Sequence, residues 1–157
     1  MLRMGRASIR HARPEDCADP ARLRHALWPE SSQEEHKREL TGLLAGRPAG
    51  NMPLEVLVAQ TADGSIAGLV EAGLRSHAEG CDESRAVGYL QGWFVDAPYR
   101  RRGIGAALLR AAEDWARNQG CREMASDASL ENKISQWVHE ALGFTEAGRA
   151  VNYRRLL

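Results

Sequence analysis

The sequence predicts a single α/β or α+β domain over residues 1–157. The length is close to the usual size of one compact domain. Hydrophobic residues make up 43% and charged residues 27% of the chain, which is typical of a globular protein. The expected order of elements is strand, two helices, three strands, helix, strand, helix and strand, and this mixture indicates helices packed on a sheet.

The first quarter of the chain predicts one strand and two helical segments. Residues 8–12 read as a short strand, and residues 14–28 as a helix that Pro20 divides or kinks. Ser32 and Glu35 have the spacing of a capping box at the start of the next helix. That helix carries its buried side at His36, Leu40, Leu43 and Leu44 and is ended by Gly46, Pro48 and Gly50.

The middle of the chain predicts three strands. Residues 54–60 and 66–75 read as a hairpin around the turn at residues 62–65. A polar surface loop at residues 76–85 leads to the strand at residues 87–95. Two glycines inside that strand, Gly88 and Gly92, predict a bulge or the close approach of another segment.

The last third predicts a helix, a strand, a helix and a final strand. Ile104, Leu108, Ala111 and Trp115 share one face of a helix that Gly120 ends. Residues 121–126 read as a strand, a helix capped by Ser129 follows and closes at Gly143, and residues 151–157 read as the last strand.

Composition excludes several classes of function. Lys and Arg total 21 and Asp and Glu total 21, so the net charge is zero, and we expect neither a nucleic acid nor a membrane as partner. No apolar run reaches about 18 residues and no secretory signal is visible, so we expect a cytoplasmic protein. The three cysteines lack metal or disulfide spacing, as do the histidines His11, His25 and His36, and we expect no metal.

The stretch from residue 94 to residue 109 carries the most chemical information. A strand runs into a basic turn with Gly103 and Gly105 and then directly into an amphipathic helix. Glycine lets backbone N–H groups approach a ligand, and a helix N-terminus favours an anion such as a pyrophosphate. Neither a dinucleotide fingerprint nor a P-loop is present. A solvated arginine loop before a surface helix is the alternative.

Arg100-x-x-Gly103-x-Gly105 resembles the acetyl-CoA loop of the GCN5-related N-acetyltransferases (GNAT), and Leu142-Gly143-Phe144 is similar to their closing motif. The resemblance implies a central, mixed, mostly antiparallel, splayed sheet with helices on both faces. A closer resemblance is to the aminoglycoside 6′-N-acetyltransferases. It rests on residues 27–29, 80–84, 120–127, 131–132 and 139–144.

This resemblance implies direct transfer of an acetyl group from acetyl-CoA to an amine in a ternary complex. The expected cosubstrate site has three parts. The edge of the strand at residues 87–95 would pair with the pantetheine, the basic turn would hold the pyrophosphate, and one residue of the helix after residues 121–126 would contact the cosubstrate. These residues are Trp93, Phe94, Val95, Arg100, Arg101, Arg102, Gly103, Ile104, Gly105 and Asn132.

The implied substrate is a polycationic aminoglycoside, which needs carboxylates and flat apolar surface. Trp28, Gln91 and Asp127 match substrate positions of the family. Ordinary packing is the alternative for Trp28, and a helix cap for Asp127. Gln91 and Gly148 stand where a family member has glutamate, and Glu79 is among the acidic residues that would compensate.

Asp127, His139 and Tyr153 are the candidate catalytic residues. Many members of the superfamily carry a tyrosine acid at the position of His139, and a histidine there could protonate the leaving thiolate. Packing or capping is the alternative role for His139.

The alternatives for the whole protein keep the fold. One is an acetyltransferase for another small amine or a protein amino group, and the other is a non-catalytic acyl-CoA-binding module. The resemblance also implies a homodimer that pairs through the C-terminal strand at residues 151–157.

Overall fold

The computed structural model describes residues 7–47 and 52–157, and it is built on a five-stranded sheet in the order β1-β2-β3-β4-β5. The strands β1 to β4 pair antiparallel, and β5 pairs parallel to β4. The mixed, mostly antiparallel sheet is therefore confirmed. The bounds are β1 Ser8–His11, β2 Leu54–Gln60, β3 Ile66–Arg75, β4 Val87–Val95 and β5 Met124–Ser126.

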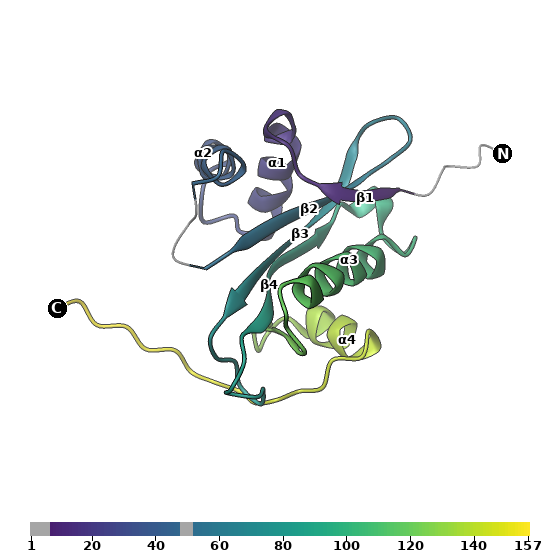
Figure 1. Ribbon diagram of the computed structural model, residues 1–157. Helices are drawn as coiled ribbons and strands as arrows, with labels where there is room; N and C mark the ends of the chain where they lie inside the picture. The colour runs from purple at the N-terminus through teal and green to yellow at the C-terminus, as the bar shows by residue number, and fades with distance from the viewer. Residues whose placement is uncertain (1–6, 48–51) are drawn as a thin grey trace.

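Helices cover both faces of this sheet, as Figure 1 shows. The bounds are α1 Ala18–Leu27 and α2 Gln33–Leu44 on one face, and α3 Ile104–Asn118 and α4 Lys133–Ala141 on the other. Two short 3-10 helices, η1 Pro14–Asp16 and η2 Ala97–Tyr99, precede α1 and α3. Alternation along the strands divides the core: Val58 and Leu69 pack beneath α1 with Leu23, whereas Leu57 and Val70 pack against α3.

The start of the chain differs in detail from its prediction. The helical segment is in two pieces, but the break lies at Cys17, and Pro20 falls within the first turn of α1. Proline is tolerated there because the first N–H groups of a helix have no intrahelical partner. The capping box of α2 is confirmed, with the Glu35 amide donating to Ser32 Oγ at 3.2 Å. The expected helix end at Pro48 and Gly50 lies outside the described residues.

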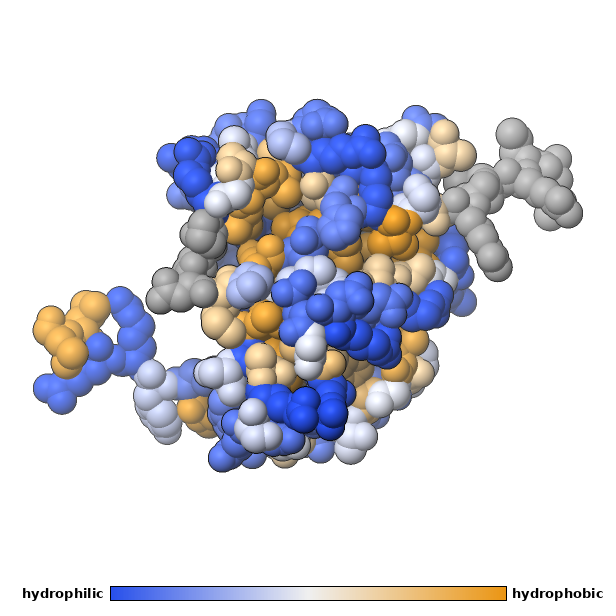
Figure 2. Space-filling model, in the orientation of Figure 1, coloured by the Kyte–Doolittle hydropathy of each residue, from blue (hydrophilic) through white to orange (hydrophobic). Residues whose placement is uncertain are grey.

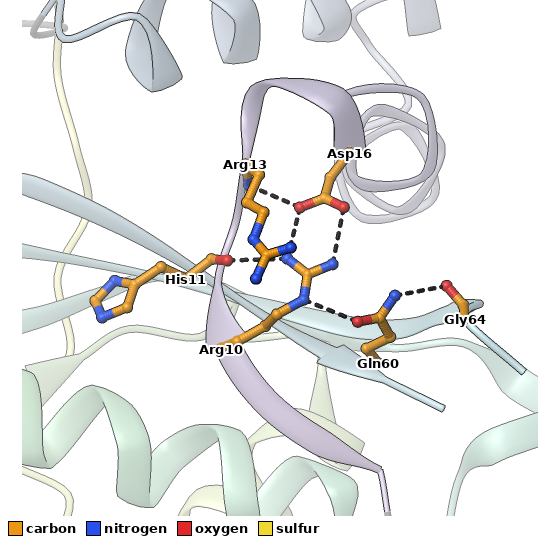
Figure 3. Close-up of polar contacts among 6 residues, drawn as sticks. All are labelled: Arg10, His11, Arg13, Asp16, Gln60 and Gly64. Atoms are coloured by element: carbon orange, nitrogen blue, oxygen red, sulfur yellow. Dashed lines mark hydrogen bonds and ion pairs between the residues drawn. The ribbon is translucent and has the colours of Figure 1, made fainter. Parts of the chain in front are cut away.

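A polar cluster ties β1 to η1 and β2 (Figure 3). Arg10 donates to both carboxylate oxygens of Asp16, at 2.7 and 2.9 Å, and its Nε donates to Gln60 Oε1 at 2.9 Å. Asp16 also accepts the Arg13 amide at 2.7 Å. The hydrogen bond from Arg10 is the main reason that the pKa of Asp16 is lowered.

The prediction of a final strand is wrong: residues 151–157 form no strand and are exposed. Tyr153 is 92% exposed and Leu156 77%. The segment leads away from the body of the molecule (Figure 1), and apolar atoms lie at its tip (Figure 2). A strand needs a neighbouring edge to pair with, and no strand in the described part of the chain pairs with this segment.

Two smaller corrections concern the neighbouring elements. The strand predicted from residue 121 begins at Met124, and the cap of α4 is Asn132 rather than Ser129. Asn132 Oδ1 accepts the Ser135 amide at 3.0 Å. Of the helices within residues 7–47 and 52–157, none has the length and apolar character to cross a bilayer.

Candidate active site

The turn between β4 and α3 presents backbone N–H groups to an open space. Arg101 and Gly103 adopt left-handed conformations, with φ of 60° and 78°, and Gly103 is the N-cap of α3. The amides that begin α3 have no intrahelical partner. The space next to both glycines is open. A Cβ added to Gly103 would have no atom within 4 Å, and a Cβ added to Gly105 would have its nearest atoms at 3.7 Å. The turn therefore fits an anionic group such as a pyrophosphate.

The arginines of this turn are partly engaged in shaping it. Arg100 Nε donates to the Val95 carbonyl at 2.8 Å, and its guanidinium lies 5.3 Å from the Phe94 ring centroid. Arg102 lies 5.8 Å from the Tyr99 ring centroid. Arg100 thus braces the turn against the end of β4.

The sheet opens at a bulge in β4. Glu71 of β3 lies opposite Gly92 and Ala72 lies opposite Leu90, so Gln91 is the additional residue. β5 pairs with β4 only through residues 88–90. Within the described chain, residues 91–95 of β4 therefore leave an edge open beside the end of β5. The predicted splay of the sheet is confirmed.

The two glycines of β4 allow two close approaches. A Cβ on Gly88 would lie 2.8 Å from the Cβ of Ala116 in α3, and a Cβ on Gly92 would lie 2.5 Å from the Trp28 ring. Both halves of the prediction for this strand, a bulge and a close approach, are confirmed.

Trp93 connects β4 to both neighbouring helices. Its Nε1 donates to the Gly105 carbonyl at 3.1 Å, in the first turn of α3. Its ring meets His139 of α4 edge-on, with centroids 5.6 Å apart. Trp93 therefore lies between the anion-binding turn and the predicted catalytic histidine.

A groove of about 1420 Å³ runs beside β5 and brings several predicted residues together. Asp127 and His139 line it, as do Glu79 and Gly148. Glu79 is close enough to Gly148 that a Cβ on this glycine would lie 3.3 Å from Glu79 Cγ. The lining holds more acidic than basic side chains, which suits a cation.

Asp127 stands at the carboxyl end of β5 and is exposed. Its Oδ2 accepts a hydrogen bond from the Tyr89 hydroxyl at 2.9 Å, and the Arg75 guanidinium lies 3.3 Å from the Tyr89 ring centroid. Burial, and then the Asp127 carboxylate, raise the pKa of Tyr89, so its hydroxyl remains a donor. Asn132 caps α4, so the capping alternative for Asp127 is wrong.

Hydrogen bonds and an aromatic ring fix the position of the His139 side chain. Its Nδ1 lies 2.7 Å from the Ser135 carbonyl and its Nε2 lies 2.9 Å from Ser126 Oγ. The Phe144 ring packs edge-on against it, with centroids 5.2 Å apart. The His139 ring can therefore be packed and still take part in catalysis, because its Nε2 contacts Ser126, a residue of the groove.

Trp28 and Gln91 lie away from this groove. Gln91 lines a separate cavity of about 500 Å³ with Arg24, Glu39 and Glu71. Trp28 packs over Gly92 at the opposite face of the bulge, and its carbonyl lies 3.0 Å from His36 Nε2. The structure thus separates Asp127 from the other two predicted substrate residues.

Two further predicted residues have other surroundings than expected. Tyr153 lies on the exposed C-terminal segment and is not among the residues that line the groove. The amide oxygen of Asn132 is used by the helix cap. Within the described residues no three His, Cys, Asp or Glu side chains gather as metal ligands.

The sequence interpretation missed Tyr89, Ser126 and Glu71. Ser126 carries a usable signal, because it directly precedes Asp127 at the end of a strand. Glu71 carries another, since a carboxylate within an apolar strand must be buried against a partner. Tyr89 offers none, because an aromatic residue in a strand is ordinary.

The open edge of β4 and the anion-binding turn define an acyl-CoA-dependent N-acetyltransferase, and the chain belongs to the acetyltransferase (GNAT) family, whose model matches residues 19–144. The chain is 40% identical to aminoglycoside N(6′)-acetyltransferase type 1 of Klebsiella aerogenes over 95% of its length and 96% of that protein. It is 41% identical to the protein of that name from Salmonella typhimurium, over 85% of this chain and 88% of the other. Within the family it therefore falls among the aminoglycoside 6′-N-acetyltransferases.

Solved structures agree with this membership. AAC(6′)-Iy in complex with the bisubstrate analogue CoA-S-monomethyl-acetylneamine has a TM-score of 0.85 and 37% identity, over 98% of this chain and all of the other. AAC(6′)-Ih from Acinetobacter baumannii has a TM-score of 0.84 and 32% identity, over 96% and 99%. AAC(6′)-Iy has also been solved with CoA, with a TM-score of 0.86 and 36% identity over 99% of both chains.

Proposed function

We propose that this protein transfers the acetyl group of acetyl-CoA to the 6′-amino group of aminoglycosides and so inactivates them in the cytoplasm. The observation that carries the proposal is the position of the Asp127 carboxylate. It stands where β4 and β5 diverge, in a groove with an acidic lining, and Trp93 connects this region to the anion-binding turn. An ammonium and a CoA thioester would meet there.

Backbone amides and arginine side chains of the turn between β4 and α3 would bind the cosubstrate. Amides at Gly103, Ile104 and Gly105 would hold the pyrophosphate, with Arg101 and Arg102 adding charge. The open backbone edge at Phe94 and Val95 would pair with the pantetheine and hold the thioester carbonyl. Acetyl-CoA supplies the activated acetyl group, and attack by the amine is direct, without an acyl-enzyme.

For the substrate, the groove offers carboxylates. Asp127, oriented by the Tyr89 hydroxyl, would bind an ammonium group. Glu79 lies beside Gly148 and would compensate for the carboxylate that the resemblance to the family leads us to expect at that position. Gln91 and Trp28 approach the bulge from the other face, where they would contact a distal ring of the substrate.

The test compares thiol release from acetyl-CoA with kanamycin and with a similar aminoglycoside that bears a 6′-hydroxyl. Release with the 6′-amine alone is expected. Asp127→Asn, which keeps the shape and removes the charge, should raise KM for kanamycin, whereas Asp114→Asn on the exposed face of α3 should not. Release of thiol only with polyamines or peptides would contradict the proposed substrate and indicate that the protein acetylates another amine.

We also propose that the protein is a homodimer in which residues 151–157 pair with the second copy. Val151, Tyr153 and Leu156 are 71–92% exposed on a segment that pairs with no strand within the described residues, and Ile134 and Trp137 expose an apolar strip on α4. Burial of such surface favours association.

The oligomeric state can be measured by light scattering on the full chain and on a chain that ends at Ala150. A dimer that the truncation converts to a folded monomer is expected. A monomeric full chain at micromolar concentration would contradict the proposal, and so would a truncated chain that remains dimeric.

A further inference from the structure

The hydrogen bonds of His139 determine which of its nitrogens carries the proton. A carbonyl oxygen only accepts hydrogen bonds, so the 2.7 Å contact of Nδ1 with the Ser135 carbonyl requires a proton on Nδ1. In the neutral ring Nε2 is therefore an acceptor. The group at 2.9 Å from Nε2 is the Ser126 hydroxyl, which must donate to it.

This arrangement leaves the oxygen of Ser126 as the acceptor. Once its proton is directed at Nε2, the lone pairs of Oγ remain for another donor. Ser126 lines the groove and immediately precedes Asp127 at the end of β5, where β4 and β5 part. Asp127 directly follows Ser126 in the chain, so a substrate ammonium bound by the Asp127 carboxylate would be a donor close to Ser126 Oγ.

The surroundings of the ring limit other routes for its proton. Trp93 and Phe144 pack against His139 edge-on, with ring centroids 5.6 and 5.2 Å away. His139 itself also lines the groove, and among the described residues Ser126 is the polar side chain in contact with Nε2.

We propose that Ser126 and His139 form a proton relay that deprotonates the substrate ammonium. The proposal rests on the acetyltransferase function above. Ser126 is the residue that faces the amine, and His139 is the base behind it.

Ser126 Oγ takes one proton from the ammonium as its own proton passes to His139 Nε2, which gives a neutral amine and an imidazolium. The amine nitrogen forms the C–N bond as the thioester C–S bond breaks, and its surplus proton leaves to solvent. The imidazolium returns its proton through Ser126 to the thiolate, which gives free thiol and restores the relay.

Three variants separate a relay from a hydrogen bond that only holds the histidine in place. Ser126→Ala removes the hydroxyl, Ser126→Thr keeps it, and His139→Gln keeps an oxygen that can accept from Ser126 but cannot take up a proton. His25→Gln is the matched control, because His25 Nδ1 also lies 2.8 Å from a serine carbonyl but outside the groove.

We expect Ser126→Ala and His139→Gln each to lower kcat about 100-fold with little change in KM for kanamycin. Ser126→Thr should retain kcat within about threefold, and the double variant should be no slower than the worse single variant, since the two residues act as one unit. A His139→Gln enzyme with normal kcat would overturn the relay and leave Ser126 a positioning residue.

Nitrogen-15 NMR of the histidine rings tests the relay without turnover. At a pH at which the ring is neutral, the resonances that disappear in His139→Gln should be those of a ring protonated at Nδ1, and Ser126→Ala should shift its Nε2. A ring protonated at Nε2 would refute the relay even in an active enzyme. An Nδ1-protonated ring in a protein that fails to acetylate kanamycin would instead refute the proposed substrate, and the variants would then be assayed with the amine that the protein does accept.

Discussion

Replacement of Glu71 by leucine should destabilise this protein more than almost any other single change to a charged residue. Glu71 Oε1 lies 2.8 Å from Arg24 Nε, and the two side chains are only 2% and 9% exposed. Burial raises the pKa of the Glu71 carboxyl, and the charge of Arg24 opposes that change. Removal of the carboxylate leaves a buried guanidinium whose remaining ion pair is with the solvent-exposed Glu39, 3.1 Å away.

The expected cost is about 3–5 kcal/mol of unfolding free energy, because a buried charge loses its partner. A typical domain has about 5–15 kcal/mol in total, so the variant should remain folded but close to its limit. The double variant Arg24→Met/Glu71→Leu removes both charges together and should recover to within about 1 kcal/mol of the wild type. Glu39→Gln is the matched control and should cost less than about 1 kcal/mol, since Glu39 is 59% exposed.

Urea denaturation followed by far-ultraviolet circular dichroism measures all four proteins on one scale. We expect a large loss of unfolding free energy in the single variant and its recovery in the double variant. A double variant as unstable as Glu71→Leu would contradict this, because the cost would then come from the packing of the leucine side chain rather than from an unpaired charge.

Three other changes test separate parts of the structure. Asp16→Asn should cost about 1.5–3 kcal/mol at neutral pH, where Asp16 binds Arg10 as a carboxylate. Because the folded pKa of Asp16 is lowered, this stabilisation should be lost as pH falls through that pKa, so urea midpoints of wild type and variant should converge in acid; parallel curves would contradict this. Gly92→Ala should displace the Trp28 ring, cost about 1–3 kcal/mol and raise KM for kanamycin, and an unchanged melting temperature would show that the ring moves freely. Gly42→Ala in α2, where the nearest atom would be 3.8 Å away, should instead raise stability by about 0.5–1 kcal/mol, and a lower melting temperature would contradict the described packing.

Local patterns in the sequence predicted most of the fold. The hairpin of β2 and β3 and the capping box at Ser32 are confirmed because each depends on residues a few positions apart. The predicted apolar face of α3 is confirmed in part, since Ile104 and Leu108 are buried whereas Ala111 and Trp115 are only partly buried. The anion-binding turn at Gly103 belongs to the same class, since helix starts and left-handed glycines are local features.

Two of the errors have separate physical reasons. The segment at residues 151–157 was expected to be a strand, but a strand needs an edge to pair with, and the local sequence does not supply one. The cap of α4 was expected at Ser129, yet Asn132 makes the hydrogen bond, since several polar residues compete at a helix start.

Motifs in the sequence identify the family and the position of the anion-binding turn, because a motif is a property of neighbours along the chain, and the mixed sheet follows from the resemblance to that family. Which side chains share a groove is set by the tertiary structure. It placed Asp127 with His139 and Ser126, set Gln91 in a separate cavity, and buried Glu71 against Arg24. Contacts between residues far apart in the chain depend on strand register, on the bulge at Gln91 and on helix packing, and spacing along the chain does not determine these.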